Sequence, residues 1–198
     1  IDPVRFIGNR SSGKMGVALA LECANNGAEV TLVLGPSTID VVHSNISVFR
    51  VDSASEMLDV VDSNFAHSDI SIFSAAVSDY KPCSVAKNKL KKSADDLTIS
   101  LVKTRDILLE MALKKSKNQF VVGFALETEN ELDNAREKLR KKNVDMIVLN
   151  SLNNKGAGFD HNTNQITIID NKNKITNFEL KDKSEVAKDI MSKVLELI

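Results

Sequence analysis

Residues 8–34 read GNRSSGKMGVALALECANNGAEVTLVL, and this stretch decides the fold. Its small residues and glycines predict a turn, and residues 12–24 predict a helix with apolar positions on one side. Asn26-Gly27 ends that helix, and residues 29–34 predict a strand that Gly35-Pro36 stops. A turn, a helix and a strand in this order are typical of a parallel α/β unit.

The rest of the chain continues to alternate strands and helices. Apolar runs predict strands at residues 48–51, 70–77, 97–102, 120–125 and 144–149. Helical spacing predicts one helix after the capping box Ser53-x-x-Glu56 and further helices at residues 106–115, 129–142 and 184–198. Residues 165–169 and 174–178 flank a turn sequence and predict a hairpin.

This order predicts an α/β protein with a Rossmann-like, three-layer αβα architecture. We expect a mostly parallel sheet, a C-terminal β-hairpin and a single domain over residues 1–198. Ligands of such sheets bind at the carboxyl ends of the strands. The segments to examine are therefore residues 8–16, 35–36, 74–79 and 124–128, and Asn150.

The composition is that of an ordinary globular protein, with 198 residues, 42% apolar and 27% charged. No apolar run approaches the roughly 20 residues that span a bilayer, which excludes an integral membrane protein. The net charge of −1 argues against a whole-surface attraction to nucleic acid. Cys23 and Cys83 are far apart and no metal-binding cluster is visible, so we expect a reduced, cytoplasmic protein.

Residues 8–16 nearly match a phosphate-binding loop, but Met15 stands where a magnesium-binding hydroxyl is needed. The start of a helix can still hold a phosphate or carboxylate through its free N–H groups. The phosphate contacts would then come from Ser11, Ser12, Gly13 and Lys14. A plain helix start, capped by Ser11 or Ser12, is an equally weighted alternative. Asn9 is either a turn residue or a donor to an oxyanion.

Small residues follow the predicted strand at 70–77, and they would let a ligand lie against the backbone. Asp79 could then accept bonds from a ligand, or simply end the strand in an Asx-turn. Residues 78–96 carry five lysines and predict a long loop: a solvated loop, a nucleic-acid contact, or a lid over a polyphosphate. Lys138 and Lys142 share a helical face, either as anion contacts or as part of a solvated surface.

Several segments together resemble the bacterial phosphopantothenoylcysteine synthetase family over nearly the whole chain. They are DPVRFIGNRSSGKMG (2–16), AAVSDY (75–80), KLKK (89–92), GFALET (123–128) and DMIVLN (145–150). The resemblance implies a ligase that joins 4′-phosphopantothenate to L-cysteine, using CTP with Mg²⁺ held mainly by the nucleotide phosphates. It also implies a homodimer, and a fusion to a flavin-dependent decarboxylase in the full-length protein.

The resemblance assigns roles to individual residues. Lys89 matches the lysine of a flexible lid, about residues 80–96 here, and would neutralise charge as the α-phosphate is attacked. Asn9 matches an asparagine that holds the acyl oxygen of the intermediate. The expected contacts to CTP are Phe73, Ser74, Ala75, Asp79, Lys89, Arg105, Asp106, Ile107, Leu108, Phe124, Lys138 and Lys142. The expected contacts to phosphopantothenate or the acyl-cytidylate are Arg5, Asn9, Ala75 and Ala76.

The chain departs from the family pattern in three ways. A glycine-rich segment and a first strand, which normally precede Asp2, are missing, so we expect a trimmed domain. The flavin-binding half is also missing, so we expect no flavin and no decarboxylation. Arg105 replaces a neutral residue. The alternatives are an NAD(P)-binding oxidoreductase, which lacks its G-x-G-x-x-G motif here, and a non-catalytic nucleotide- or RNA-binding module.

Overall fold

A computed structural model describes residues 1–91, 97–151 and 161–198. Its central sheet has five strands in the order β10-β9-β7-β6-β3. The strands are β3 (Ile70–Phe73), β6 (Phe120–Glu127), β7 (Met146–Ser151), β9 (Ile166–Asp170) and β10 (Ile175–Asn177). β3, β6 and β7 pair in parallel, whereas β9 and β10 form the predicted hairpin and join β7 in antiparallel fashion.

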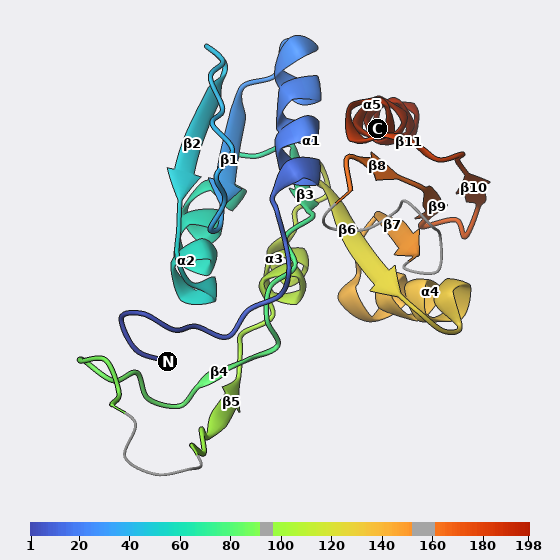
Figure 1. Ribbon diagram of the computed structural model, residues 1–198. Helices are drawn as coiled ribbons and strands as arrows, with labels where there is room; N and C mark the ends of the chain where they lie inside the picture. The colour runs from blue at the N-terminus through green and yellow to red at the C-terminus, as the bar shows by residue number, and fades with distance from the viewer. Residues whose placement is uncertain (92–96, 152–160) are drawn as a thin grey trace.

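Helices cover both faces of this sheet (Figure 1). On one face, α1 (Lys14–Asn25) and α5 (Lys183–Leu197) share a core with β7 and β9, built on residues such as Leu19 and Ile190. On the other face, α2 (Ala54–Phe65), α3 (Ile107–Lys114) and α4 (Glu131–Lys142) share a second core around Met111. The predicted α/β class and its three-layer arrangement are therefore confirmed.

The sheet is divided, which the sequence did not indicate. β1 (Val30–Leu34) and β2 (Ile46–Arg50) form a separate parallel pair. The ends of β1 and β3 both meet the first turn of α1, because Gly13 packs on Leu34 and Gly16 packs on Ser74. Residues of both strands also line one cavity. In the described part of the chain no strand pairs with the inner edges of β1 and β3, so the sheet is open between them.

Three predicted segments differ from the structure. The strand predicted at 70–77 ends at Phe73, because the chain leaves the sheet at residue 74. The predicted loop at 78–96 includes a strand, β4 (Tyr80–Pro82), which pairs with β5 (Leu101–Lys103). β5 is also shorter than the predicted strand at 97–102. Residues 92–96 lie outside the described residues. Figure 1 shows β4 and β5 as an arm that extends away from the helical layers.

A short antiparallel pair, β8 (Thr163–Asn164) and β11 (Lys181–Asp182), lies beside α5. Among the described residues, no helix has the length and apolar character that crossing a membrane requires.

Candidate functional site

The first turn of α1 presents backbone N–H groups that the helix itself cannot pair. Gly13 takes the cap position with φ of 77° and has no side chain to cap the helix, while the Ser12 hydroxyl accepts a long, 3.5 Å hydrogen bond from the Lys14 N–H. The preceding loop is fixed from the side, because the Ser37 hydroxyl donates a 2.8 Å hydrogen bond to the Ser12 carbonyl. A helix start with no acidic residue in its first turn, and with only this long bond from Ser12, is suited to an anion. Both interpretations of residues 8–16 therefore keep support, because the Ser12 bond fits a capped start and the other N–H groups fit an anion site.

Asn9 joins this loop to the segment that follows β3. Its amide group donates to the carbonyls of Ala76 and Val77, both at 3.2 Å. These two carbonyls therefore bond to a side chain rather than to a neighbouring strand. The carboxylate of Asp79 makes no side-chain hydrogen bond to the described residues, whereas its carbonyl accepts from Thr104. No Asx-turn is formed there, so that carboxylate is available to a ligand.

The start of α3 is tied to the end of α4. Asp106 caps α3 by accepting from the Leu109 N–H at 3.0 Å, and its second oxygen pairs with the Lys142 ammonium. Burial opposes the charged form of Asp106, but the bonds from Lys142 and Leu109 hold its pKa below the usual value. Asp106 therefore fixes where Lys142 presents its charge.

Lys138 lies one turn before Lys142 and is largely buried. Burial lowers the pKa of Lys138 and the charge of Lys142 adds to this effect, while Glu127, Asp106 and Asp79 oppose it. No hydrogen bond or ion pair holds its ammonium group among the described residues. A partly desolvated lysine beside a paired one is a suitable contact for a polyphosphate.

Three predicted residues direct their side chains elsewhere. Arg105 forms two bonds to Glu110, of 2.9 and 2.5 Å, which raise the pKa of its guanidinium. Ile107 is buried in the core, so only its backbone can reach a ligand. Lys14 donates to the Asn162 side chain at 2.8 Å.

The predicted residues converge on a single cavity of about 2310 Å³, with Lys89 as the exception. The predicted residues that line it are Arg5, Asn9, Ser11, Ser12, Gly13, Lys14, Phe73, Ser74, Ala75, Ala76, Asp79, Arg105, Asp106, Ile107, Leu108, Phe124, Lys138 and Lys142. Lys89 is exposed and lies outside this lining.

Two cavity oxygens lack hydrogen-bond partners among the described residues: Thr104 Oγ1 and Asn150 Oδ1, both buried. Buried polar atoms are rarely left unpaired, so each is a candidate ligand contact. The sequence marks Asn150 as a position to examine because it follows a predicted strand, and ligands of such sheets bind at the carboxyl ends of strands. Thr104 carries no sequence signal, because only the fold brings it beside residue 79.

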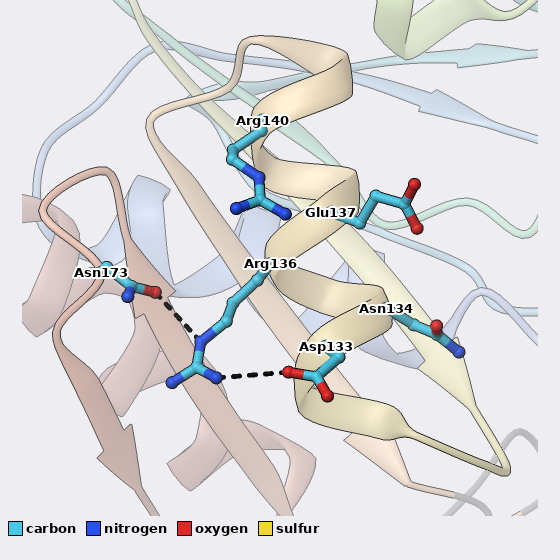
Figure 2. Close-up of a pocket in the computed structure, with 6 residues that line it drawn as sticks. All are labelled: Asp133, Asn134, Arg136, Glu137, Arg140 and Asn173. Carbon is cyan, nitrogen blue, oxygen red and sulfur yellow. Dashed lines mark hydrogen bonds and ion pairs between the residues drawn. The ribbon is translucent and has the colours of Figure 1, made fainter.

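A smaller pocket of about 510 Å³ lies on α4 and the β9–β10 turn (Figure 2). Arg136 dominates it, donating to Asn173 at 3.1 Å and to Asp133 at 3.4 Å. Positions 136 and 140 are two residues away from Lys138 and therefore lie on nearly the opposite side of the helix. This pocket contains none of the predicted site residues.

Comparison with known proteins places the whole chain in a family. Residues 1–198 match the family described as the DNA/pantothenate metabolism flavoprotein C-terminal domain. A protein from Haemophilus influenzae, named coenzyme A biosynthesis bifunctional protein CoaBC, is 40% identical over 196 residues. The match covers 99% of this chain and 48% of that relative. A protein of an unknown prokaryotic organism, named cysteine/cysteine sulfinic acid decarboxylase, is 53% identical over 198 residues. That match covers 100% of this chain and 55% of that relative.

Among solved structures, the crystal structure of the C-terminal domain of a coenzyme A biosynthesis bifunctional protein CoaBC is similar throughout. The TM-score is 0.82 at 36% identity, and the match covers 98% of this chain and 87% of that chain. The present chain thus spans about half the length of the curated relatives that it matches.

Proposed function

The chain belongs to the DNA/pantothenate metabolism flavoprotein C-terminal domain family, and from this premise we propose that it is a phosphopantothenate–cysteine ligase. In this proposal it joins 4′-phosphopantothenate to L-cysteine in coenzyme A biosynthesis. The name of the CoaBC relatives and the fold shared with a CoaBC C-terminal domain support the proposal. The observation that carries it is the convergence of the start of α1, the Asn9 amide and the lysines of α4 on one cavity.

The proposed reaction has two steps. The carboxylate of 4′-phosphopantothenate attacks the α-phosphate of CTP, which forms an acyl-cytidylate and releases pyrophosphate. The amine of cysteine then attacks the acyl carbon, loses a proton, and displaces CMP as the amide forms. A free carboxylate is a poor acyl donor because its leaving group would be oxide, and the mixed anhydride supplies a better one.

Each part of the cavity has a task in this reaction. The N–H groups at the start of α1 bind phosphate oxygens, and Lys138 and Lys142 offset the charge of the triphosphate. Asn9 holds the acyl oxygen of the intermediate when its amide turns an N–H from the Ala76 and Val77 carbonyls to that oxygen. Lys89 approaches the α-phosphate as negative charge develops there. Lys89 is exposed and lies outside the cavity lining, so its long side chain has to turn toward the cavity for this contact.

Magnesium fits this site as a companion of the nucleotide. No group of three or more His, Cys, Asp or Glu residues comes together as a metal site within the described ranges. The triphosphate itself would supply most of the ligands for Mg²⁺, with the cavity carboxylate of Asp79 as a further candidate ligand. When bound, the ion would screen the charge of the phosphates.

The homodimer belongs to the same proposal. Val4, Phe6 and Ile7 precede the anion loop and are 62%, 78% and 40% exposed. Tyr80 and Leu101 on the β4–β5 arm are exposed as well. An apolar surface of this kind beside a site is typical of an interface, and a second copy of the chain is the occupant that we propose.

The relatives' greater length suggests what else the full protein contains. We assign the open space between β1 and β3 to a strand that precedes residue 1, because both strand edges face the same cavity. We assign the decarboxylation in the name of the 53% identical relative to the part of it that this chain does not span. We also propose a cytoplasmic location, in keeping with the proposed role in coenzyme A biosynthesis.

Pyrophosphate release tests the proposed ligase. The intact protein is incubated with 4′-phosphopantothenate and CTP or ATP side by side, and release should require both the acid and the nucleotide. Equal release without 4′-phosphopantothenate would refute the proposal. Reduction of NAD(P)⁺ would instead support the oxidoreductase, and steeply salt-dependent RNA binding without nucleotide turnover would support the binding module.

A further inference from the structure

Asp2 occupies an unusual position for a carboxylate near the start of an irregular segment. Its side chain is fully buried, and its two oxygens accept five hydrogen bonds from N–H groups. Oδ1 accepts from the backbone of Val4 and Arg5, both at 2.9 Å. Oδ2 accepts two bonds from the Arg5 guanidinium, at 3.0 and 2.6 Å, and one from the Leu90 N–H at 3.1 Å.

The bond to Leu90 connects segments far apart in sequence. Both sides of Leu90 are held, because the Arg5 guanidinium also donates to the Leu90 carbonyl at 3.2 Å. A third contact lies nearby, where the Ala86 N–H donates to the Ile1 carbonyl at 3.0 Å. We call Asp2, Arg5 and Leu90 together the Asp2 clip. Lys89 lies between the two anchored positions, Ala86 and Leu90.

The backbone and the side chain of Lys89 are held differently. The backbone around Lys89 is anchored, whereas its side chain is exposed and has no ion pair among the described residues. Arg5 holds the pKa of Asp2 well below its usual range, with the N–H groups of Val4, Leu90 and Arg5 assisting. The clip therefore stays charged at any ordinary assay pH.

We propose that Asp2 is a positioning residue for Lys89: by holding the Leu90 backbone through the clip, it fixes the place from which the Lys89 ammonium reaches the nucleotide. The inference rests on the proposed function for the role of Lys89. Arg5 then works first through the clip, since its guanidinium is committed to Asp2 and to Leu90. A lysine held on an anchored backbone loses less conformational freedom when it meets its phosphate.

Asp2→Asn tests the clip selectively. The asparagine carbonyl can still accept from Val4 and Arg5, but an NH₂ group then faces the guanidinium and the Leu90 N–H. Hydrogen exchange of the Leu90 amide, measured on the intact protein without substrates, should become about 10-fold faster or more. Pyrophosphate release should slow by roughly 10- to 100-fold. An unchanged exchange rate at Leu90 would overturn the proposal whether or not the protein is a ligase.

A double-mutant cycle with Lys89→Gln separates positioning from general damage. If Asp2 acts through Lys89, adding Asp2→Asn to Lys89→Gln should slow pyrophosphate release no further, and independent multiplied losses would refute the link. Asp170→Asn is the matched control, since Asp170 is also buried and holds a turn through the N–H groups of Lys172 and Lys174. It should leave exchange at Leu90 unchanged.

Thermal unfolding would reveal whether Asp2→Asn fails to fold, and in that case a second variant tests the clip. Arg5→Lys keeps a positive charge beside Asp2 but removes the planar fork that also reaches the Leu90 carbonyl. Exchange at Leu90 should again accelerate. A normal exchange rate in a folded Arg5→Lys protein would equally overturn the clip.

Discussion

Gly13 is the residue on which the proposed anion site at the start of α1 most depends, and Gly13→Ala tests this in detail. Gly13 has φ of 77°, and an added Cβ would lie 2.9 Å from Leu34 Cδ1 and 3.2 Å from Ser37 Oγ. The left-handed backbone alone costs a non-glycine residue about 1–2 kcal/mol. The contact with the buried Leu34 adds about 1–3 kcal/mol, the usual cost of overpacking.

Gly27→Ala is the matched control. Gly27 has φ of 90°, but an added Cβ there would meet nothing within 4 Å. This variant should therefore lose only the backbone contribution, about 1–2 kcal/mol of the free energy of unfolding. Gly13→Ala should lose about 2–5 kcal/mol, the sum of the backbone and contact contributions.

Urea unfolding of both variants measures the difference, and enzyme kinetics measure its consequence. Relief of the contact must move the loop away from Leu34, and this shifts the N–H groups that receive phosphate. The Michaelis constant for CTP should rise about 10-fold in Gly13→Ala, equivalent to roughly 1.4 kcal/mol, and remain normal in Gly27→Ala. Equal losses of stability in the two variants, or an unchanged Michaelis constant in Gly13→Ala, would refute the reasoning.

Three more outcomes concern the lysines and Asn9. Lys89→Gln should slow pyrophosphate release about 100-fold because a cation no longer meets the developing charge, and normal formation of the acyl-cytidylate would contradict that role. Asn9→Asp should still release pyrophosphate but form the amide product poorly, because a carboxylate cannot donate a hydrogen bond to the acyl oxygen. The loss of the bonds to Ala76 and Val77 also costs about 1–3 kcal/mol in total. Undiminished amide formation, measured by chromatography, would show that Asn9 has no such part. Burial lowers the pKa of Lys138, so this lysine loses its charge at a lower pH than an ordinary lysine does. CTP affinity, measured by calorimetry across the alkaline range, should therefore begin to fall at that lower pH. Lys138→Arg should remove that dependence, and identical pH profiles for the two proteins would contradict it.

The sequence predicted an element well where all the residues that determine it lie in one short segment. Ser53 does cap α2 by accepting from the Glu56 N–H at 3.2 Å. The Glu56 carboxylate returns a bond as a capping box requires, although it accepts from Asp52 rather than from Ser53. The β9–β10 hairpin also follows its turn sequence. These features depend on residues within a few positions of one another.

Long-range contacts were the part that the sequence could not supply. The apolar run 70–77 does not show that residues 76 and 77 give their carbonyls to Asn9. Nothing in the sequence predicts that Asp106, at the start of α3, pairs with Lys142 at the end of α4. The family resemblance placed most candidate residues on one cavity, but their individual partners became visible only in the fold.

The division of the sheet has a practical consequence for studying this chain alone. Among the described strands, none pairs with the inner edges of β1 and β3, and such open edges recruit strands from other molecules. In gel filtration, self-association through these edges would imitate the proposed homodimer. A synthetic β-strand peptide that fills the opening should dissolve the edge-linked species and leave a dimer built on Phe6 and the β4–β5 arm intact. The same opening makes the chain a natural half of a split-enzyme reporter, in which the peptide restores the signal.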